Sequence, residues 1–247
     1  MIGRSTAPTG AAQQAQPGAS LPTAGYFGLQ MMAGLLVFAA AAWLFGGVAE
    51  DVVTGDPLVQ RDLAMERWFQ LHRAPPLSAI LSGVSRLHDW PAVTGITVLL
   101  VLYLAWRREW RWATTVILVV PGGMLLNVLL KVAFHRTRPT LSGLAAALHS
   151  YSFPSGHVMA ATLTYGVAAA YLITRLASWR GKVLTVLAAC CLVALVAFSR
   201  VYLGVHYVSD VVAAASAGVT WLASSIMAAD ALWHRRATAR RVLSRAA

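Results

Sequence analysis

The chain has 247 residues, of which 58% are hydrophobic and only 12% are charged, and its mean hydropathy is +0.63. This balance excludes an ordinary soluble domain and indicates an integral membrane protein. The formal net charge of +11 calls for no nucleic-acid partner, because basic residues beside membrane segments bind anionic lipid at the cytoplasmic surface.

The N-terminal residues 1–25 are rich in Ala, Gly, Pro, Gln and Thr, and Arg4 is their only charged residue. Such a composition cannot bury a core, so we expect a disordered tail. A cleaved signal peptide is the alternative. The apolar segment that follows is longer than an ordinary signal core and has no cluster of basic residues in front of it.

Long apolar segments dominate the remainder of the chain. Crossing ~30 Å of hydrocarbon takes roughly 20 helical residues. Continuous apolar character favours helices over barrel strands, which alternate. The predicted spans, of which the second is short and the fifth marginal, are residues 26–49, 91–106, 112–133, 157–178, 182–199 and 207–233. We therefore predict an all-α integral membrane six-helix bundle, with one domain over 26–234.

Two shorter stretches lie between the first and second predicted spans. Residues 57–72 combine mixed charge with a loose apolar face, which is typical of a helix lying along the membrane interface. Residues 76–87 are predicted to form a short interfacial helix.

The only two cysteines, Cys190 and Cys191, are adjacent within an apolar segment. Their spacing offers neither a disulfide framework nor a zinc site. We expect them to pack as small core residues.

When six spans cross the bilayer in alternating directions, each of the 20 Lys and Arg residues is assigned to the inner or the outer side. With the N-terminus inside, twelve fall on the inner side and eight on the outer side. This bias fits the positive-inside rule, so both termini are predicted to be cytoplasmic, with residues 235–247 as a basic cytoplasmic tail.

The stretch KVAFHRTRP follows the third span. Lys131 ends the apolar run, and Arg138 comes seven positions later, directly before Pro139. The proline biases Arg138 toward an extended backbone, which leaves its guanidinium free to point away from the helix. The alternative is that both cations are snorkelling residues at a helix end.

The stretch YSFPSGHVMA begins the fourth span on the same outer face. Ser155 is a good N-cap, and Gly156 allows a close backbone approach. Free N–H groups and the positive end of the helix dipole make this turn a suitable anion site, with His157 beside the anion. The alternative for His157 is an ordinary polar flank.

The stretch SRVYLGVHYVSD joins the fifth and sixth spans. Arg200 supplies another outer cation, and His206 and Asp210 are four residues apart, so they share one helical face. A carboxylate that accepts a hydrogen bond from one imidazole nitrogen leaves the other unprotonated, as a nucleophile or a base. An acid inside the membrane boundary also requires a partner, and His206 is the obvious one.

Helix alternation places all three stretches on one membrane face. Lys131, Arg138 and Arg200 would supply positive charge there, and the two histidines proton transfer and nucleophilicity. Together they predict a phosphate site. Two histidines and an aspartate could also bind a metal, but the three cations would repel a divalent ion, so we expect no metal or other cofactor.

The combination of K-x6-RP at 131–139, PSGH at 154–157 and SR-x5-H-x3-D at 199–210 resembles the type 2 phosphatidic acid phosphatase (PAP2) superfamily, whose core is shared by vanadate haloperoxidases. The three blocks span about a third of the chain. The resemblance implies that His206 attacks phosphorus to form a phosphohistidine, that Asp210 orients it, and that His157 protonates the leaving oxygen and later activates water. It also implies a metal-independent reaction in which the phosphoryl oxygens are held by Lys131, Arg138, Ser155, Gly156 and Arg200.

The expected activity is hydrolysis of a phosphomonoester or pyrophosphate bond of a membrane lipid, on the periplasmic or extracellular side of a bacterial inner membrane. Phosphatidic acid, phosphatidylglycerol phosphate, an isoprenyl pyrophosphate and a lipid A phosphate all fit, and the motifs do not separate them. The roles of Arg136, His135 and His149 and the oligomeric state are not readable from the sequence.

Two other functions remain as alternatives. A vanadate-dependent haloperoxidase would share the anion cradle, although six hydrophobic spans argue against it. A transporter or channel for a phosphorylated lipid or an anion would need polar residues at mid-depth in several helices. Here they gather at one end, with Asn127 as the main exception.

Overall fold

The computed structural model describes residues 23–55, 57–140 and 150–246, and these residues form helices and no strand. This confirms the all-α prediction. The helices are α1 (Thr23–Thr54), α2 (Pro57–Leu71), α3 (Pro75–Arg86), α4 (Trp90–Trp106), α5 (Trp110–Phe134), α6 (Gly156–Arg175), α7 (Trp179–Tyr202) and α8 (Val208–Ala246).

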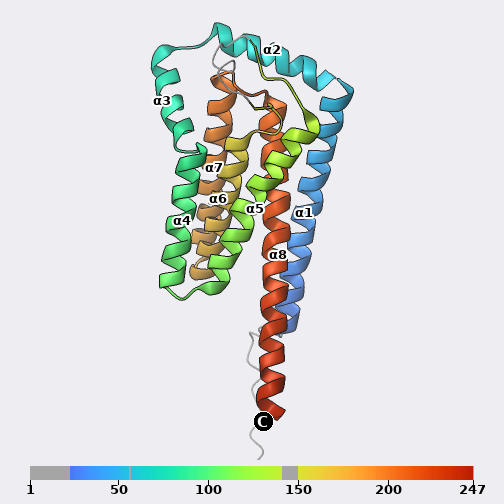
Figure 1. The fold of residues 1–247 in the computed structure, drawn as a ribbon, viewed down its shortest axis with the longest axis vertical. Helices are drawn as coiled ribbons and strands as arrows, with labels where there is room; N and C mark the ends of the chain where they lie inside the picture. The colour runs from blue at the N-terminus through green and yellow to red at the C-terminus, as the bar shows by residue number, and fades with distance from the viewer. Residues whose placement is uncertain (1–22, 56, 141–149, 247) are drawn as a thin grey trace, which may run out of the picture.

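The helices run up and down, so alternate connections meet at the same end of the bundle (Figure 1). Helix α2 lies across one end, which we call the site end. The connections from α5 to α6 and from α7 to α8 lie at that end too. The helix ends at Thr23 and Ala246 lie at the opposite end, where α1 and α8 run side by side. Three distant parts of the sequence are thereby brought to one end.

Among the described residues, five helices are long and apolar enough to cross a membrane, namely α1, α5, α6, α7 and α8. Helix α4 has 17 residues and rises only about 25 Å, which falls short of ~30 Å of hydrocarbon. It qualifies together with α3, to which it is joined at a bend of 46°. Counting this bent pair as one span gives the predicted six, with residues 76–87 belonging to the second span.

The core forms where α5, α6 and α8 meet. Val119, Val158, Leu163 and Val167 are fully buried there. Helix α6 is central, with 44% of its span buried inside the protein. The start of α6, which is the predicted fourth span, is therefore fixed in position relative to α5 and α8.

The two cysteines contradict the prediction of core packing, because Cys190 and Cys191 are both exposed. They lie on α7, an outer helix with only 6% of its span buried against the rest of the protein. Lipid tails are as apolar as a protein core, so hydropathy alone does not separate the two environments.

The helix ends differ from the predicted domain limits. Helix α8 continues without a break through residues 235–246, and α1 begins at Thr23, so residues 23–25 are helical. The remainder of the predicted N-terminal tail, residues 1–22, lies outside the described residues.

We expect Gly218→Ala to destabilise the bundle. A Cβ on Gly218 of α8 would come within 2.8 Å of Cγ2 and 3.0 Å of Cβ of Thr162 on α6. Thr162 is buried and β-branched, so it cannot turn away. Overpacking of this kind costs about 1–3 kcal/mol of unfolding free energy, which a lowered melting temperature in detergent would reveal.

The matched control is Gly95→Ala on α4, where an added Cβ meets nothing within 4 Å. That change should be neutral or gain up to about 1 kcal/mol through helix propensity. Equal melting temperatures for the two variants would contradict the tight contact between α6 and α8.

Candidate active site

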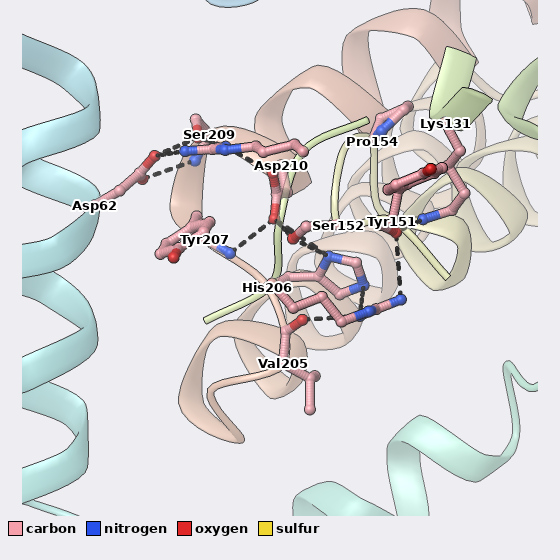
Figure 2. A network of polar contacts seen from close by, with 12 residues as sticks. Asp62, Lys131, Tyr151, Ser152, Pro154, Val205, His206, Tyr207, Ser209 and Asp210 are labelled. Carbon is pink, nitrogen blue, oxygen red and sulfur yellow. Dashed lines mark hydrogen bonds and ion pairs between the residues drawn. The ribbon is translucent and has the colours of Figure 1, made fainter. Parts of the chain in front are cut away.

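The carboxylate of Asp210, in the first turn of α8, has no exposed surface. Its Oδ2 accepts a hydrogen bond from the backbone N–H of Tyr207 at 2.9 Å and another from the hydroxyl of Ser152. The same oxygen lies 3.3 Å from Nδ1 of His206. Its Oδ1 accepts from Arg136 Nη1 at 2.6 Å (Figure 2). A buried carboxylate requires such donors, so this residue fixes the positions of several segments.

His206 is buried beside this carboxylate, so the two side chains are in contact, but it lies in the turn before α8 and not on the helical face that the four-residue spacing predicted. Because Nδ1 faces Asp210, we assign the proton to Nδ1, which leaves Nε2 unprotonated, with a lone pair that can accept a hydrogen bond. Arg138 Nη1 lies 3.3 Å from this Nε2. Burial above all, helped by the charges of Arg200 and Arg138, lowers the pKa of His206 to about 3, although Asp210 opposes the shift. The imidazole is therefore neutral near pH 7.

Arg138 and Lys131 hold the segment that leads to α6. Arg138 donates from Nε to the carbonyl of Ser150 at 2.7 Å and from Nη1 to the carbonyl of Val205 at 2.9 Å. Lys131 donates to the carbonyl of Tyr151. These partners are neutral, so they fix the positions of both cations without pairing their charge.

The start of α6 is tied to both α5 and α8. Ser155 takes the N-cap position, as predicted, and its backbone N–H donates to the carbonyl of Asp210 at 3.1 Å. Asn127 Nδ2 donates to the carbonyl of Pro154 at 3.3 Å, and a Cβ on Gly156 would come 3.3 Å from Asn127 Oδ1. The Ser155 hydroxyl makes no capping bond and is buried without a hydrogen-bond partner among the described residues.

His157 and Arg200 have their direct contacts at the corner between α3 and α4. His157 Nε2 lies 2.7 Å from Oδ1 of Asp89, a half-exposed residue at the N-cap of α4. Arg200 Nη1 donates to the hydroxyl of Ser85, and Arg200 Nε is buried without a partner in the described structure. Arg200 lies within electrostatic range of both His157 and His206. Its charge therefore links the two predicted catalytic histidines.

Several residues of this site were missed or left without a role. Ser152 and Asp89 were missed, and Arg136 now proves to contact Asp210 directly. Asp62 of α2 is 2% exposed and accepts hydrogen bonds from Arg136 and from Ser209. The structure shows Asp62, Glu66 and Phe69 buried at helical spacing, and they mark a face of α2 that packs inward.

Of the two histidines whose roles the sequence left open, the structure describes one. His135 ends α5 in a left-handed conformation, with φ of 47°, and its ring contacts Tyr151 edge-on. His149 lies outside the described residues. Within the described ranges, no group of three or more His, Cys, Asp or Glu side chains is arranged to hold a metal ion.

Comparison with known proteins decides the family. Residues 112–233 match the PAP2 superfamily. The "Phosphatidylglycerophosphatase B" of Bacillus subtilis (strain 168) is 33% identical over 179 residues, which cover 72% of this chain and 87% of that relative. The chain belongs to the PAP2 superfamily. The predicted resemblance is thus confirmed.

A second PAP2 relative is the "Lipid phosphate phosphatase delta" of Arabidopsis thaliana, 29% identical over 187 residues, which cover 70% of this chain and 41% of that relative. Among solved structures, a transmembrane PAP2 type phosphatidylglycerolphosphate phosphatase from Bacillus subtilis has a TM-score of 0.67 at 30% identity, covering 76% of this chain and 93% of that one. LpxE of Aquifex aeolicus has a TM-score of 0.51 at 23% identity over 66% of this chain and 93% of its own, and supports the fold alone.

The PAP2 match includes every residue of the predicted site, from Lys131 to Asp210. Asp62 and Asp89 lie before the matched range, on α2 and at the start of α4. The structure therefore adds two carboxylates from outside the family's matched region to the site.

We expect Asn127→Asp to destabilise this PAP2 chain. Asn127 is 2% exposed and donates to the carbonyl of Pro154. A carboxylate of the same shape would place an acceptor against that acceptor, at a cost of about 1–3 kcal/mol. Thermal unfolding measures the loss, with Thr114→Ala on an exposed position of α5 as control. An unchanged melting temperature would contradict the contact between Asn127 and Pro154.

Proposed function

We propose that this PAP2 membrane phosphatase hydrolyses a phosphomonoester or pyrophosphate bond of a lipid through a phosphohistidine at His206. One observation carries the proposal. Asp210 occupies the Nδ1 side of the buried imidazole, and the unprotonated Nε2 faces Arg138 Nη1. A neutral histidine with one nitrogen oriented by a carboxylate and the other next to a cation is suited to attack phosphorus.

In the first step, the Nε2 lone pair of His206 forms a bond to phosphorus while the bond from phosphorus to the leaving oxygen breaks. His157 gives a proton to that oxygen as general acid. The imidazole ring of His206 becomes positively charged, and Asp210 stabilises that charge through Nδ1. Asp89, 2.7 Å from His157 Nε2, holds the imidazole ring in place.

In the second step, His157 takes a proton from water, and the resulting hydroxide attacks phosphorus. The bond between phosphorus and Nε2 breaks, inorganic phosphate leaves, and His206 returns to its neutral form. One water is consumed, and His157 ends protonated, ready for the next cycle.

Three cations and two unpaired donors would stabilise the charge on the phosphoryl oxygens. Phosphoryl transfer depends mainly on placement and on stabilising the equatorial oxygens. Lys131, Arg138 and Arg200 supply positive charge at the site end. The Ser155 hydroxyl and Arg200 Nε are buried donors without protein partners in the described structure, so a phosphoryl group bound at Gly156 would satisfy them. Neither role requires a metal ion, and we propose a metal-independent reaction.

The proposed substrate is a lipid phosphate whose tails stay in the bilayer. Phosphatidylglycerol phosphate is our first choice, because two of the similar proteins bear that activity in their names. Phosphatidic acid, an isoprenyl pyrophosphate and a lipid A phosphate remain in the test. Transport is disfavoured because Asn127, the one mid-depth polar residue considered for a path, is buried against Pro154. Those similar proteins whose names state an activity are all named as phosphatases, which likewise favours a phosphatase over a haloperoxidase.

We also propose that both termini are cytoplasmic and that the site faces the periplasm or the outside of a bacterial inner membrane. The charge bias of the sequence supports this orientation. Residues 26–234 would form the membrane domain. The flanking tails 1–25 and 235–247 would extend on the cytoplasmic side.

The test is phosphate release by purified protein from each candidate lipid, with and without EDTA, beside His206→Ala. We expect release from at least one lipid, unaffected by EDTA. His206→Ala should lose at least about 10³-fold, because it removes the nucleophile.

His72→Ala is the matched control, since His72 is an exposed histidine at the site end whose ring bonds the carbonyl of Trp68. Its activity should equal that of the unaltered protein. Retained turnover in His206→Ala would overturn the assigned nucleophile. Complete loss in EDTA would overturn the metal-independent mechanism.

A further inference from the structure

Charges of alternating sign form a buried row from His206 to α2. Arg136 Nη1 donates to Oδ1 of Asp210 at 2.6 Å, and its Nη2 donates to Oδ2 of Asp62 at 2.9 Å. The side chains of Asp210, Arg136 and Asp62 are 0%, 10% and 1% exposed. Little water reaches this row, so each charge acts strongly on the next.

The guanidinium of Arg136 is fixed from three sides. Asp62 holds Nη2, and the Ser209 hydroxyl accepts from Nη1 at 2.6 Å. The ring of Tyr207 lies under the guanidinium, 4.4 Å from its central carbon. Figure 2 shows Asp62 reaching from α2 to Ser209, next to Asp210. Asp62 of α2 therefore helps to fix the distance between Arg136 and Asp210, together with Ser209 and Tyr207.

We propose that Asp62 and Arg136 are positioning residues that set how strongly Asp210 stabilises the positive charge that develops on His206 during attack. Arg136 partly neutralises Asp210, and Asp62 in turn partly neutralises Arg136. With this balance, Asp210 keeps enough negative charge to stabilise the imidazolium. Arg136 at the same time offsets the cost of burying that charge. This inference rests on the proposed role of His206.

Removing either charge disturbs the balance in opposite directions. Without Asp62, the whole charge of Arg136 acts on Asp210 and competes with the imidazolium. Without Arg136, two buried carboxylates are left without their shared counterion, and Asp210 favours the protonated form of His206.

A purely structural role is the competing explanation. Asp62 Oδ1 also accepts from the backbone N–H of Ser209 at 3.1 Å, near the start of α8, and so joins α2 to that helix. Losing this contact alone would lower stability and leave the pH dependence of the folded enzyme unchanged. The pH profile therefore separates the two roles.

Other charged groups around the imidazole stay constant in the experiment. They come from α2, α5, the segment after α5, α6 and α7. The groups are Lys131, Arg138, His157, Arg200 and Glu66. Glu66 acts on Tyr207, the neighbour of His206.

The experiment compares pH profiles of kcat/KM for the unaltered protein, Asp62→Asn, Arg136→Gln and the double variant, with one lipid phosphate in one detergent. The acidic limb of the profile reports protonation of His206. In Arg136→Gln, this limb should move to higher pH by about one unit or more. In the double variant, the shift should be smaller, because Asp62 no longer adds its own charge. Asp62→Asn should lower kcat about tenfold, equivalent to ~1.4 kcal/mol, with no upward shift.

Arg61→Gln, an exposed change beside Asp62 on α2, is the control and should match the unaltered protein. Thermal unfolding of each variant gives its folded fraction. An unchanged acidic limb in every variant, with activity that follows the folded fraction, would overturn the inference. If Arg136→Gln does not fold, Asp62→Asn decides, because unaltered kcat in that folded variant has the same consequence.

His206→Ala in the same series separates this inference from the proposed function. If that variant is inactive while the Asp62 and Arg136 variants behave like the unaltered protein, only the positioning role fails. If it keeps full activity, the proposed function fails, and the positioning role fails with it.

Discussion

A carboxylate with no exposed surface, at the first turn of a membrane helix, determines how the site end of this protein is built. Asp210 is stable there only because donors reach it from both connections at the site end: Arg136 and Ser152 from the one between α5 and α6, and Tyr207 from the one between α7 and α8. Its own backbone carbonyl accepts from Ser155 at the start of α6. Because leaving one buried charge unpaired costs several kcal/mol, these segments are held together as one unit. The geometry around His206 follows from that requirement.

The basic residues divide into two kinds by the partners they have. Arg136 bonds two carboxylates, so its charge is largely neutralised. Arg138, Lys131 and Arg200 bond carbonyls or a hydroxyl, which fix their positions without cancelling their charge. A site with three fixed and uncompensated cations at the end of a helix bundle favours a dianionic phosphate over a metal ion. The distinction separates Arg136 from Arg138, only two positions away, and explains why they have different roles.

Local spacing in the sequence was enough to predict part of this arrangement. The four-residue separation of His206 and Asp210 predicted their contact, and the alternation of spans predicted that Lys131, Ser155 and Arg200 meet at one end. The partners from α2 and α4 could not be found in this way, because Asp62 lies 148 positions from Asp210 in the sequence and no local period links them. Hydropathy likewise could not show that α7 faces outward with its cysteines, since lipid and protein core are equally apolar. It also gave no sign that α3 and α4 are long and apolar enough to cross a membrane only when taken together as a bent pair.

The most direct test of this account is to trap the phosphorylated enzyme. His157→Ala, supplied with an aryl phosphate whose leaving group needs no protonation, should complete the first step and stall before water attacks. The account predicts a label that is labile in acid and stable in base, found by mass spectrometry on the peptide containing His206 and lost when His206 is also replaced. A label on another residue, or undiminished labelling after His206 is replaced, would contradict it.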